Sequence, residues 1–357
     1  MLRFHTSRCG WILVLTLGLW AVVAQSQELR YRYVSLAQVE LPSGFLFWFP
    51  VAIDDRGRIY GFALTCATAT CDSLRSYIAV YADGAVTVRQ PGIVYAANAR
   101  GTIGGSVQID PENFIQQAAL FHGDQVELVP PQPGEVTSFV TALNDAGMAL
   151  VTSYDAAGQP TYVLYKNGQA TPLDFGLQVF GYLRINNQGI ISGTAYTLPE
   201  FSFHGFRFDT RTGETTPLAP LPTEPDAWAL AINNRGDVLG YSFVAAGLER
   251  IGVWDRDAEF TTYFVEGTPA FPTISNNLLF NDNNLIVITD VSNPASERGT
   301  SYLVPKPGVR LNLADLVENL PVGQNLDSIT AMNNRGNMIG SSSTDDFLLE
   351  RIGVGKQ

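Results

Sequence analysis

The sequence predicts an all-β protein, a seven-bladed β-propeller in which an N-terminal strand completes the last blade. Three observations lead to this prediction. A short phrase occurs seven times, the segments between its copies look like strands, and the chain has one strand too many at its start and one too few at its end. A repeat of about forty to fifty residues built from strands is typical of propeller blades.

The repeated phrase consists of an apolar residue, an Asn or Asp, two variable residues and a Gly. Its copies end at residues 57, 101, 147, 189, 236, 284 and 336, in steps of 42 to 52 residues. A tight hairpin turn that requires positive φ accepts Gly freely and Asn next best, and Asn284 takes the Gly position in the sixth copy. The Asn or Asp can cap the turn by accepting from backbone N–H groups. We interpret the phrase as a fold signature rather than as a ligand site repeated seven times.

Each repeat contains four strand-like segments, and the fifth repeat shows them most clearly. Residues 227–232 alternate between large and small side chains, as a strand packed on both faces would. The phrase follows, and 237–242, 251–254 and 260–265 supply three further strands. No part of the chain after its first 24 residues shows a sustained helical period, which indicates sheets throughout.

The two ends of the chain predict how the ring closes. The seventh repeat has a second strand at 337–341 and a third at 347–351, but no fourth strand follows. An additional strand, 31–36, precedes the first phrase. If this strand becomes the outermost strand of the last blade, the two ends leave no exposed sheet edge, and exposed edges promote aggregation.

Residues 1–24 have the pattern of a secretory signal peptide. Arg3 and Arg8 precede the apolar segment 11–20, and small residues at 22–24 offer a cleavage site. An uncleaved membrane anchor is the alternative, but the apolar segment is shorter than the ~20 residues that a membrane span requires. We therefore expect residues 25–357 to form a single secreted or periplasmic propeller domain.

The charge of the chain disfavours several classes of partner. Removal of Arg3 and Arg8 with the signal peptide lowers the net charge from −12 to −14, and both nucleic acids and anionic membranes favour dense Lys and Arg. Phosphate-binding glycine loops, zinc-binding His motifs and nucleophile elbows are absent from the sequence. We expect no cofactor, no nucleic-acid or membrane partner after cleavage, and a monomer.

Cys66 and Cys71 are the two cysteines that follow the signal peptide. In an oxidising compartment, two cysteines this close in one loop are expected to form a disulfide. A metal site is the alternative, but no third or fourth ligand stands near them in the sequence.

One stretch of the fourth and fifth repeats resembles a known family. His204-Gly205-Phe206 is followed by residues 229–240, which read Ala-Leu-Ala-Ile-Asn-Asn-Arg-Gly-Asp-Val-Leu-Gly. This resembles the HAF-repeat family of bacterial extracellular proteins, with Gly205 where that family has Ala, and the repeated phrases extend the resemblance over most of the mature chain. The resemblance implies secretion and a propeller-like repeat fold. It implies no catalytic residues, because the activity of that family is not established.

Few residues suggest catalysis. His122 and His204 are predicted at matching ends of the third strand in their repeats, where a structural role is expected. The turns look superficially like calcium loops, but most of their ligand positions are Asn, which brings no charge. Arg235-Gly236-Asp237 spells an adhesion tripeptide, although the hairpin already explains each of its residues.

The variable loops are the better candidates for function. In a propeller of this strand order, the connections from second to third strand and from fourth to first strand emerge on the same face, the loop face. We predict that this face binds a protein or a glycan and that the protein is not an enzyme; for Phe47 and Trp228 the alternative is that they seal the gaps between blades. A polysaccharide hydrolase or lyase that uses Glu112 or Asp226 is the alternative function. The candidate ligand-binding residues are Trp48, Glu112, Tyr196, His204, Asp226 and Trp228.

Overall fold

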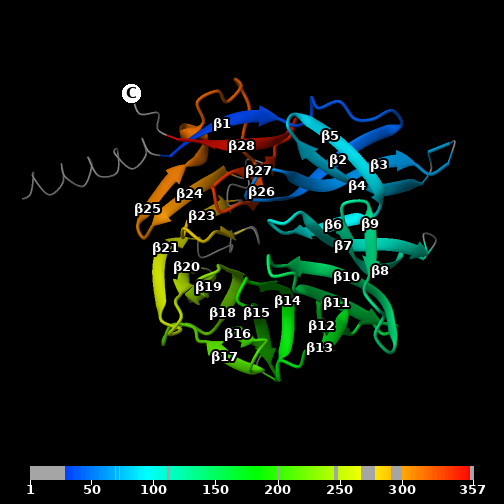
Figure 1. Cartoon of the computed structure of the whole chain (residues 1–357). Coiled ribbons are helices and arrows are strands. Elements are labelled where there is room, and N and C mark those ends of the chain that lie inside the picture. The colour runs from blue at the N-terminus through cyan, green and yellow to red at the C-terminus, as the bar shows by residue number, and fades with distance from the viewer. Residues whose placement is uncertain are drawn as a thin grey trace, which may run out of the picture.

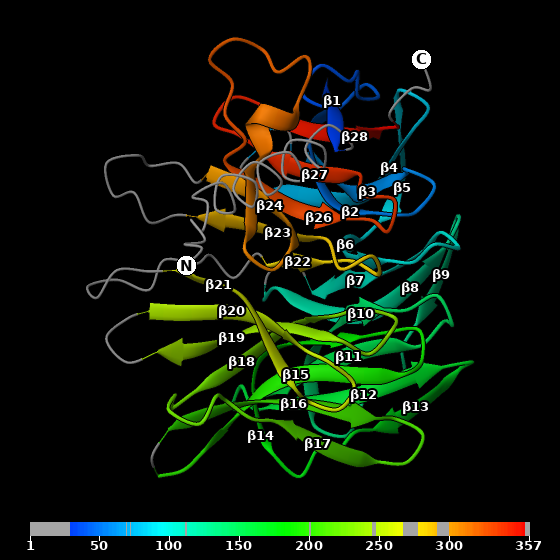
Figure 2. The same ribbon diagram turned by 90° about the vertical axis from the view of Figure 1, so that its left-hand side faces the viewer.

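The computed structural model describes residues 29–353 except 69, 72, 111–112, 200, 245–247, 267–277 and 291–299. Within these residues the chain forms seven four-stranded antiparallel sheets. The sheets are arranged radially around a central axis (Figure 1), and Figure 2 shows the same ring from its side. The predicted seven-bladed β-propeller is therefore confirmed. No helix in the described part of the chain is long and apolar enough to cross a membrane.

The strands of each blade are given below in order from the innermost to the outermost. The innermost strands of neighbouring blades contact one another. A short 3-10 helix, η1 (Leu313–Leu316), follows the last strand of blade 6. Blade 1 contains β2 (Phe45–Ile53), β3 (Ile59–Cys66), β4 (Leu74–Ala82) and β5 (Ala85–Pro91), and blade 2 contains β6 (Ile93–Ala97), β7 (Thr102–Asp110), β8 (Ile115–His122) and β9 (Gln125–Leu128). Blade 3 contains β10 (Glu135–Leu143), β11 (Ala149–Asp155), β12 (Pro160–Lys166) and β13 (Gln169–Pro172). Blade 4 contains β14 (Gln178–Ile185), β15 (Ile190–Thr197), β16 (Ser202–Asp209) and β17 (Glu214–Leu218). Blade 5 contains β18 (Ala227–Ile232), β19 (Val238–Val244), β20 (Leu248–Trp254) and β21 (Phe260–Glu266). Blade 6 contains β22 (Leu279–Phe280), β23 (Ile286–Asp290), β24 (Thr300–Lys306) and β25 (Val309–Asn312). Blade 7 contains β26 (Ser328–Met332), β27 (Met338–Ser341), β28 (Asp346–Ile352) and, outermost, β1 (Arg30–Ser35).

The hydrophobic core lies between the blades. The cluster between blades 7 and 1, for example, joins Ile339 and Leu348 to Trp48, Ile59 and Tyr81. Because each sheet is covered on both faces, its central strands are buried over most of their length. This is the reason that their sequences look like continuous apolar runs rather than strict alternations.

The ring closes as the sequence predicts. β1 pairs antiparallel with β28, with Tyr31 opposite Arg351 and Ser35 opposite Phe347. The side-chain amide of Asn319 reinforces the strand by bonding both the N–H and the carbonyl of Tyr33, at 2.8 and 3.0 Å. The last blade is therefore built from both ends of the chain, which lie side by side in Figure 1.

The repeated glycines have the backbone that their role requires. Gly57, Gly101, Gly147, Gly189, Gly236 and Gly336 all have φ between 77° and 89°, and Asn284 has φ 57°. In every copy the Asn or Asp is at most 4% exposed, and its Oδ1 accepts from the backbone N–H four residues further on. The phrase is thus the capped hairpin turn predicted from the sequence.

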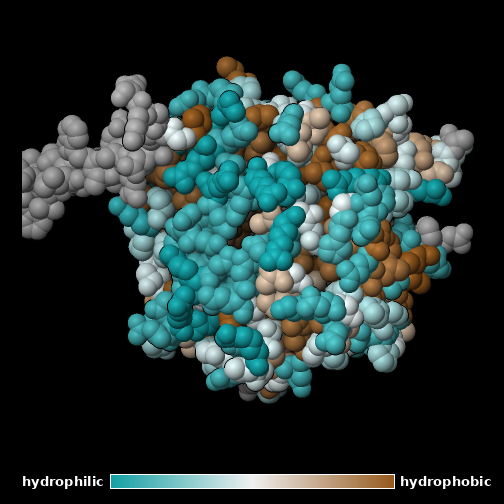
Figure 3. All heavy atoms as spheres, viewed as in Figure 1, coloured by the Kyte–Doolittle hydropathy of each residue, from teal (hydrophilic) through white to brown (hydrophobic). Residues whose placement is uncertain are grey.

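The asparagines among these residues also join their blade to the next one, whereas Asp54 of blade 1 has no side-chain N–H to donate. Asn144 donates from Nδ2 to the carbonyl oxygen of Asn186 at 2.7 Å, and Asn333 donates in the same way to Asp54, across the closure of the ring. The residues that follow them form a second ring, in which the N–H of Asn334 donates to Asp55 Oδ1 at 2.8 Å. We call the face that carries these turns the turn face. Figures 1 and 3 view the turn face, and its centre is mostly hydrophilic.

A second glycine position accompanies most of the turns, and sequence reasoning missed it. The innermost strand of several blades contains a β-bulge, such as the register shift between Pro50 and Ala52. The bulge brings a backbone oxygen against the neighbouring strand, so that a Cβ at Gly61 would lie 1.9 Å from the oxygen of Phe49 and one at Gly240 1.9 Å from that of Trp228. These positions accept only Gly because of close backbone approach.

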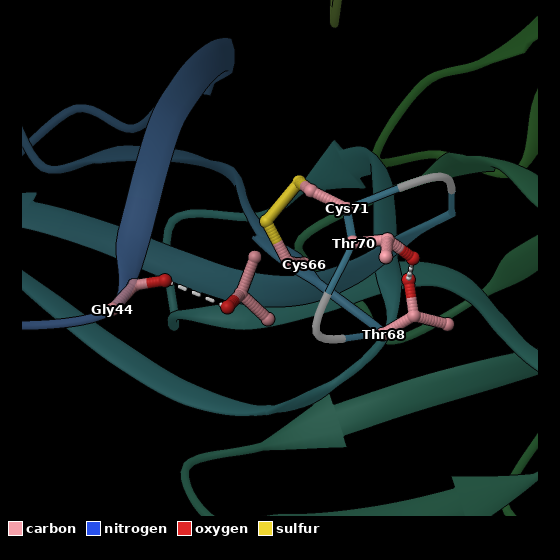
Figure 4. Close-up of a disulfide and its surroundings, with 6 residues drawn as sticks. Gly44, Cys66, Thr68, Thr70 and Cys71 are labelled. Carbon is pink, nitrogen blue, oxygen red and sulfur yellow. Dashed lines mark hydrogen bonds between the residues drawn. A yellow bond between two sulfur atoms is a disulfide. The ribbon is translucent and has the colours of Figure 1, made fainter.

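The predicted disulfide between Cys66 and Cys71 is present in the loop between β3 and β4. Figure 4 shows it beside the hydrogen bond from Thr65 Oγ1 to the carbonyl oxygen of Gly44, 2.7 Å long, and the contact between the hydroxyls of Thr68 and Thr70. The loop lies at the end of blade 1 opposite the repeated turn. The signal peptide predicted at 1–24 lies outside the described residues.

Candidate ligand-binding site

A large cavity lies between blades 3 and 4, at the loop face. Its volume is about 680 Å³, and Thr141, Thr152 and Leu183 contribute to its walls. A second cavity of about 590 Å³ adjoins it and shares four of its lining residues. Six aromatic side chains line the larger cavity: Tyr95, Phe139, Tyr154, Tyr162, Phe180 and Tyr196.

An irregularity of β14 makes room for this cavity. Between the pairs Phe180–Thr194 and Arg184–Ser192, β14 has two more residues than β15. Gly181, at φ 75°, lies within this wide bulge and lines the cavity. A bulge bends its strand and re-aims the side chains on it. In blade 4, Phe180, Gly181 and Leu183 of the bulged segment line the cavity, together with aromatic residues of blades 2 and 3.

The cavity walls are held by contacts between aromatic rings. Tyr95 packs edge-on against Phe139 with centroids 5.6 Å apart, and Phe139 packs in the same way against Tyr154 at 6.3 Å. On the other wall, Phe180 lies 5.2 Å from Trp228 and 6.5 Å from Tyr196. Because such ring pairs fix orientation, the cavity is formed before any ligand arrives.

Two tyrosines of the site, Tyr95 and Tyr162, have hydroxyls that are partly removed from water. Burial raises the pKa of Tyr162 to about 12 and also raises the pKa of Tyr95. The hydroxyls of Thr141 and Thr152 lie 3.3 Å apart in the same wall. The site therefore combines apolar ring faces with a few uncharged hydrogen-bonding groups.

Of the residues predicted from the sequence, Tyr196 lines both cavities, and Trp228 supports one wall. Tyr196 stacks on the exposed ring of Phe201 with an interplanar angle of 7°. Trp228 is half-buried, stacks on Tyr241, and has no hydrogen-bond partner for its buried Nε1 in the described part of the chain. Its contacts fit the alternative interpretation, in which it fills the gap between blades 4 and 5.

Three predicted residues lie elsewhere, and one cannot be placed. The prediction that Trp48 binds a ligand at the loop face needs correction. Trp48 is 7% exposed, stacks on Tyr81, and donates from Nε1 to the Leu36 carbonyl oxygen at 3.3 Å, so it belongs to the core. Asp226 accepts from the backbone N–H of Phe203 at 2.7 Å, which ties its carboxylate to β16. His204 is half-buried on β16 and lines neither cavity. Glu112 lies outside the described residues.

Two further expectations need correction. Phe47 is 60% exposed and therefore does not seal a gap between blades. His122 and His204 do not occupy matching ends of their strands, since His122 is the last residue of β8 and His204 is the third residue of β16. His122 lies near the turn face, where its Nε2 is 3.1 Å from Glu127 Oε2.

The rival sites considered from the sequence are used by the fold. The turn carboxylates accept N–H groups from the neighbouring blade, as Asp282 does from Asn234 at 2.6 Å. No group of three or more His, Cys, Asp or Glu residues that could hold a metal ion occurs among the residues described. In the adhesion tripeptide, the guanidinium of Arg235 pairs with Asp237 at 3.0 Å.

Most of the cavity residues were missed by sequence reasoning. The missed residues lie in strands rather than in the variable loops from which the candidates were chosen; they are Tyr95, Phe139, Tyr154, Tyr162 and Phe180. A signal was available, because aromatic residues recur near the loop-face ends of strands in three consecutive repeats. What the sequence does not reveal is the wide bulge in β14 that brings them around one space.

Comparisons with known proteins identify the fold. No family model matches the chain, and no curated protein sequence matches it. Among solved structures, it is similar to the β-propeller domain of the trilobed protease from Pyrococcus furiosus, with a TM-score of 0.55 and 8% identity over 87% of this chain and 98% of that one. It is also similar to the acylaminoacyl peptidase of Pyrococcus horikoshii (TM-score 0.55, 10% identity, 87% of this chain and 52% of that one) and, more weakly, to TolB from Acinetobacter baumannii (TM-score 0.46, 14% identity, 69% and 60%). The chain thus spans about half the length of the peptidase, and at these identities the similarity concerns the fold alone.

Proposed function

We propose that this protein is a secreted, non-catalytic binding propeller, and that its ligand occupies the aromatic cavity between blades 3 and 4. The observation that carries the proposal is the preformed space of about 680 Å³ with aromatic rings on both walls. Cavities of this size with apolar walls and a few polar groups are typical of ligand-binding sites. Its position at the loop face is the one where propeller sequences vary most freely.

Among the described residues, the lining contains no pair of carboxylates and no His beside a carboxylate, which supports a binding role. Acid–base catalysis requires two titratable groups that act on the same bond. Among the residues that line the two cavities, Asp174 is the one carboxylate, and it accepts from the backbone N–H of Gly176 at 2.9 Å. The alternative of a polysaccharide hydrolase or lyase has no observation in its favour here.

Secretion is supported by the disulfide and by the N-terminal sequence. The bond between Cys66 and Cys71 requires an oxidising compartment to persist, and residues 1–24 have the pattern of a signal peptide. Expression of the full chain in a bacterium with a secretory pathway should yield an exported protein whose N-terminus follows residue 24. An N-terminus at Met1 in the cytoplasmic fraction would contradict the proposal.

The binding role can be tested with a pair of matched variants. The mature protein is immobilised and exposed to glycan and protein mixtures, and the same is done with Phe180→Ala, which removes a cavity wall, and Phe114→Ala, which removes a more exposed ring outside both cavities. We expect a ligand that the wild type and Phe114→Ala retain and Phe180→Ala does not. If every retained ligand is held equally by all three proteins, the cavity is not the binding site.

A further inference from the structure

We propose that the ligand of the two joined cavities is a neutral oligosaccharide, an inference that rests on the binding function proposed above. The two cavities, of about 680 and 590 Å³, share Pro160, Tyr162, Val179 and Tyr196, so they form one elongated site. One half is lined by aromatic rings and the other carries amide and hydroxyl side chains. A sugar ring has the same division, because its C–H groups form apolar faces and its hydroxyls form polar edges.

The aromatic half is suited to stacking on sugar faces. Phe180 is 43% exposed and Tyr95 is 39% exposed, although both are held by neighbouring rings, Trp228 and Phe139 respectively. Rigid aromatic side chains offer a large contact area and lose little conformational freedom when a ligand binds. The site therefore presents ring surfaces that are ordered in advance and still accessible.

The second half of the site supplies groups that recognise hydroxyls. Gln159, Thr161 and Gln178 line it and are exposed to solvent, and Asp174 lies among them. An amide can donate and accept at once, as each sugar hydroxyl also can. Tyr162, which lies in both halves, adds a phenolic hydroxyl that can donate and accept a hydrogen bond. Apart from Asp174, these polar groups are uncharged and can both donate and accept hydrogen bonds.

The charge of the site excludes anionic ligands. No Lys, Arg or His lines either cavity, and the whole chain carries a net charge of −12. A phosphate, sulfate or uronate group would enter a field of the same sign without a cation to pair with. A basic peptide would find a single carboxylate, Asp174, in the lining. A neutral ligand with both apolar and polar surfaces remains as the best match.

The inference can be tested on a glycan array with the mature protein. The array carries neutral glucan, xylan, mannan, galactan and chitin oligosaccharides beside galacturonate and sulfated oligosaccharides, and proline-rich peptides are printed on the same surface. We expect binding to neutral oligosaccharides alone. Titration of the best one should change the fluorescence of Trp228, because its ring contacts Phe180 in the cavity wall, and the Trp228→Phe variant should lose that change.

Variants then place the sugar in the site. Tyr162→Ala should weaken binding by about ten-fold or more, as truncation of a central aromatic contact does. Tyr162→Phe, which keeps the ring, should retain more of the affinity, and Phe114→Ala, outside the lining, should retain all of it. Unfolding midpoints are measured beside the affinities, and losses of affinity that follow the midpoints rather than the position in the lining would overturn the inference.

The outcomes separate this inference from the binding function itself. If acidic oligosaccharides or proline-rich peptides bind instead, and Tyr162→Ala releases them, the cavity is a binding site but the sugar inference is overturned. If no printed ligand binds, or if Phe114→Ala loses affinity as strongly as Tyr162→Ala, both the sugar inference and the assignment of the cavity are overturned.

Discussion

At single residues, the repeated turn combines two requirements that the sequence shows separately. The Gly or Asn at its last position supplies a positive φ, and the buried Asn or Asp supplies an acceptor for the turn and, in most copies, a donor for the next blade. The first requirement concerns the backbone of one residue. The second joins residues that lie more than forty positions apart, so the phrase stabilises both the hairpin and the ring.

The backbone requirement can be tested at Gly236, whose φ is 89°. A Cβ there would meet no atom closer than 3.9 Å, at Arg256, so a substitution tests φ rather than space. Gly236→Val should lower the free energy of unfolding by about 1–3 kcal/mol, because β-branched residues are strained at positive φ. Gly236→Asn should lose much less, as Asn284 occupies the same turn position at φ 57°. Equal urea midpoints for Gly236→Val and Gly236→Asn would contradict a backbone role of this glycine. Gly247, the loop glycine whose substitution by Val would be the comparison, lies outside the described residues.

The disulfide should be dispensable for folding. Cys66 and Cys71 are five positions apart, and closing so short a loop contributes about 2 kcal/mol on the chain-entropy estimate. Seven interlocked blades supply the core independently of it. The Cys66→Ser/Cys71→Ser variant should fold with a modestly lower urea midpoint, measured by tryptophan fluorescence. A variant that remains unfolded without urea would show that the loop has a larger role.

At the scale of elements, the sequence predicted the repeated turns and the number of strands in each blade. It did not predict the features that depend on the register between strands. The turns, the four strands per blade and the shared last blade follow from spacing alone. The direction of a side chain does not, because a shift of one residue moves it to the other face of the sheet. The bulged strand β2 has two such shifts, and it buries Trp48 while exposing Phe47, the reverse of the expected arrangement. The cavity was missed for the same reason, since the sequence does not show the bulge in β14, whose residues line it.

The two hydrogen-bond rings of the turn face are incomplete between blades 1 and 2. Ala99 stands where the other six copies have Asp or Asn, so the N–H of Asp55 lacks the side-chain acceptor that its counterparts have. Ala99→Asn should supply this acceptor and raise the free energy of unfolding by about 0.5–1.5 kcal/mol. Ala146→Asn, at the next position of a turn whose ring bonds are already formed, is the control and should change little. A lower urea midpoint for Ala99→Asn than for the wild type would contradict the proposed repair.

For the whole molecule, the order of the strands makes stability depend on the closure of the ring. Six blades are continuous in sequence, whereas blade 7 combines β1 with β26, β27 and β28. The contact between β1 and β28 joins residues more than three hundred positions apart, and hydrogen bonds from Asn333 and Asn334 to blade 1 reinforce the same closure at the turn face. Contacts of such long range form late in folding, because the chain must first be closed.

Removal of β1 should therefore open the ring rather than shorten a tail. A chain that begins at Gly44 exposes the edge of β28, and exposed edges recruit other chains. We expect aggregation or loss of cooperative unfolding, seen by light scattering and urea titration. Removal of residues 355–357 is the control and should have no such effect. A soluble, cooperatively unfolding protein after deletion of β1 would show that six complete blades and a three-stranded seventh are sufficient.

The complementary prediction is that a covalent closure stabilises the whole molecule. Arg32 and Glu350 lie directly opposite each other on β1 and β28 and form an ion pair, so their side chains share one face. Directly opposed residues of antiparallel strands are close enough for a disulfide. The Arg32→Cys/Glu350→Cys variant, oxidised, should gain up to about 5 kcal/mol in the free energy of unfolding, because its loop includes nearly the entire chain. The gain should vanish on reduction, and a Cys pair at Arg211 and Glu350, which are not opposed, should not form the bond. If the oxidised variant unfolds at the same urea concentration as its reduced form, separation of β1 from β28 does not limit the stability of this propeller.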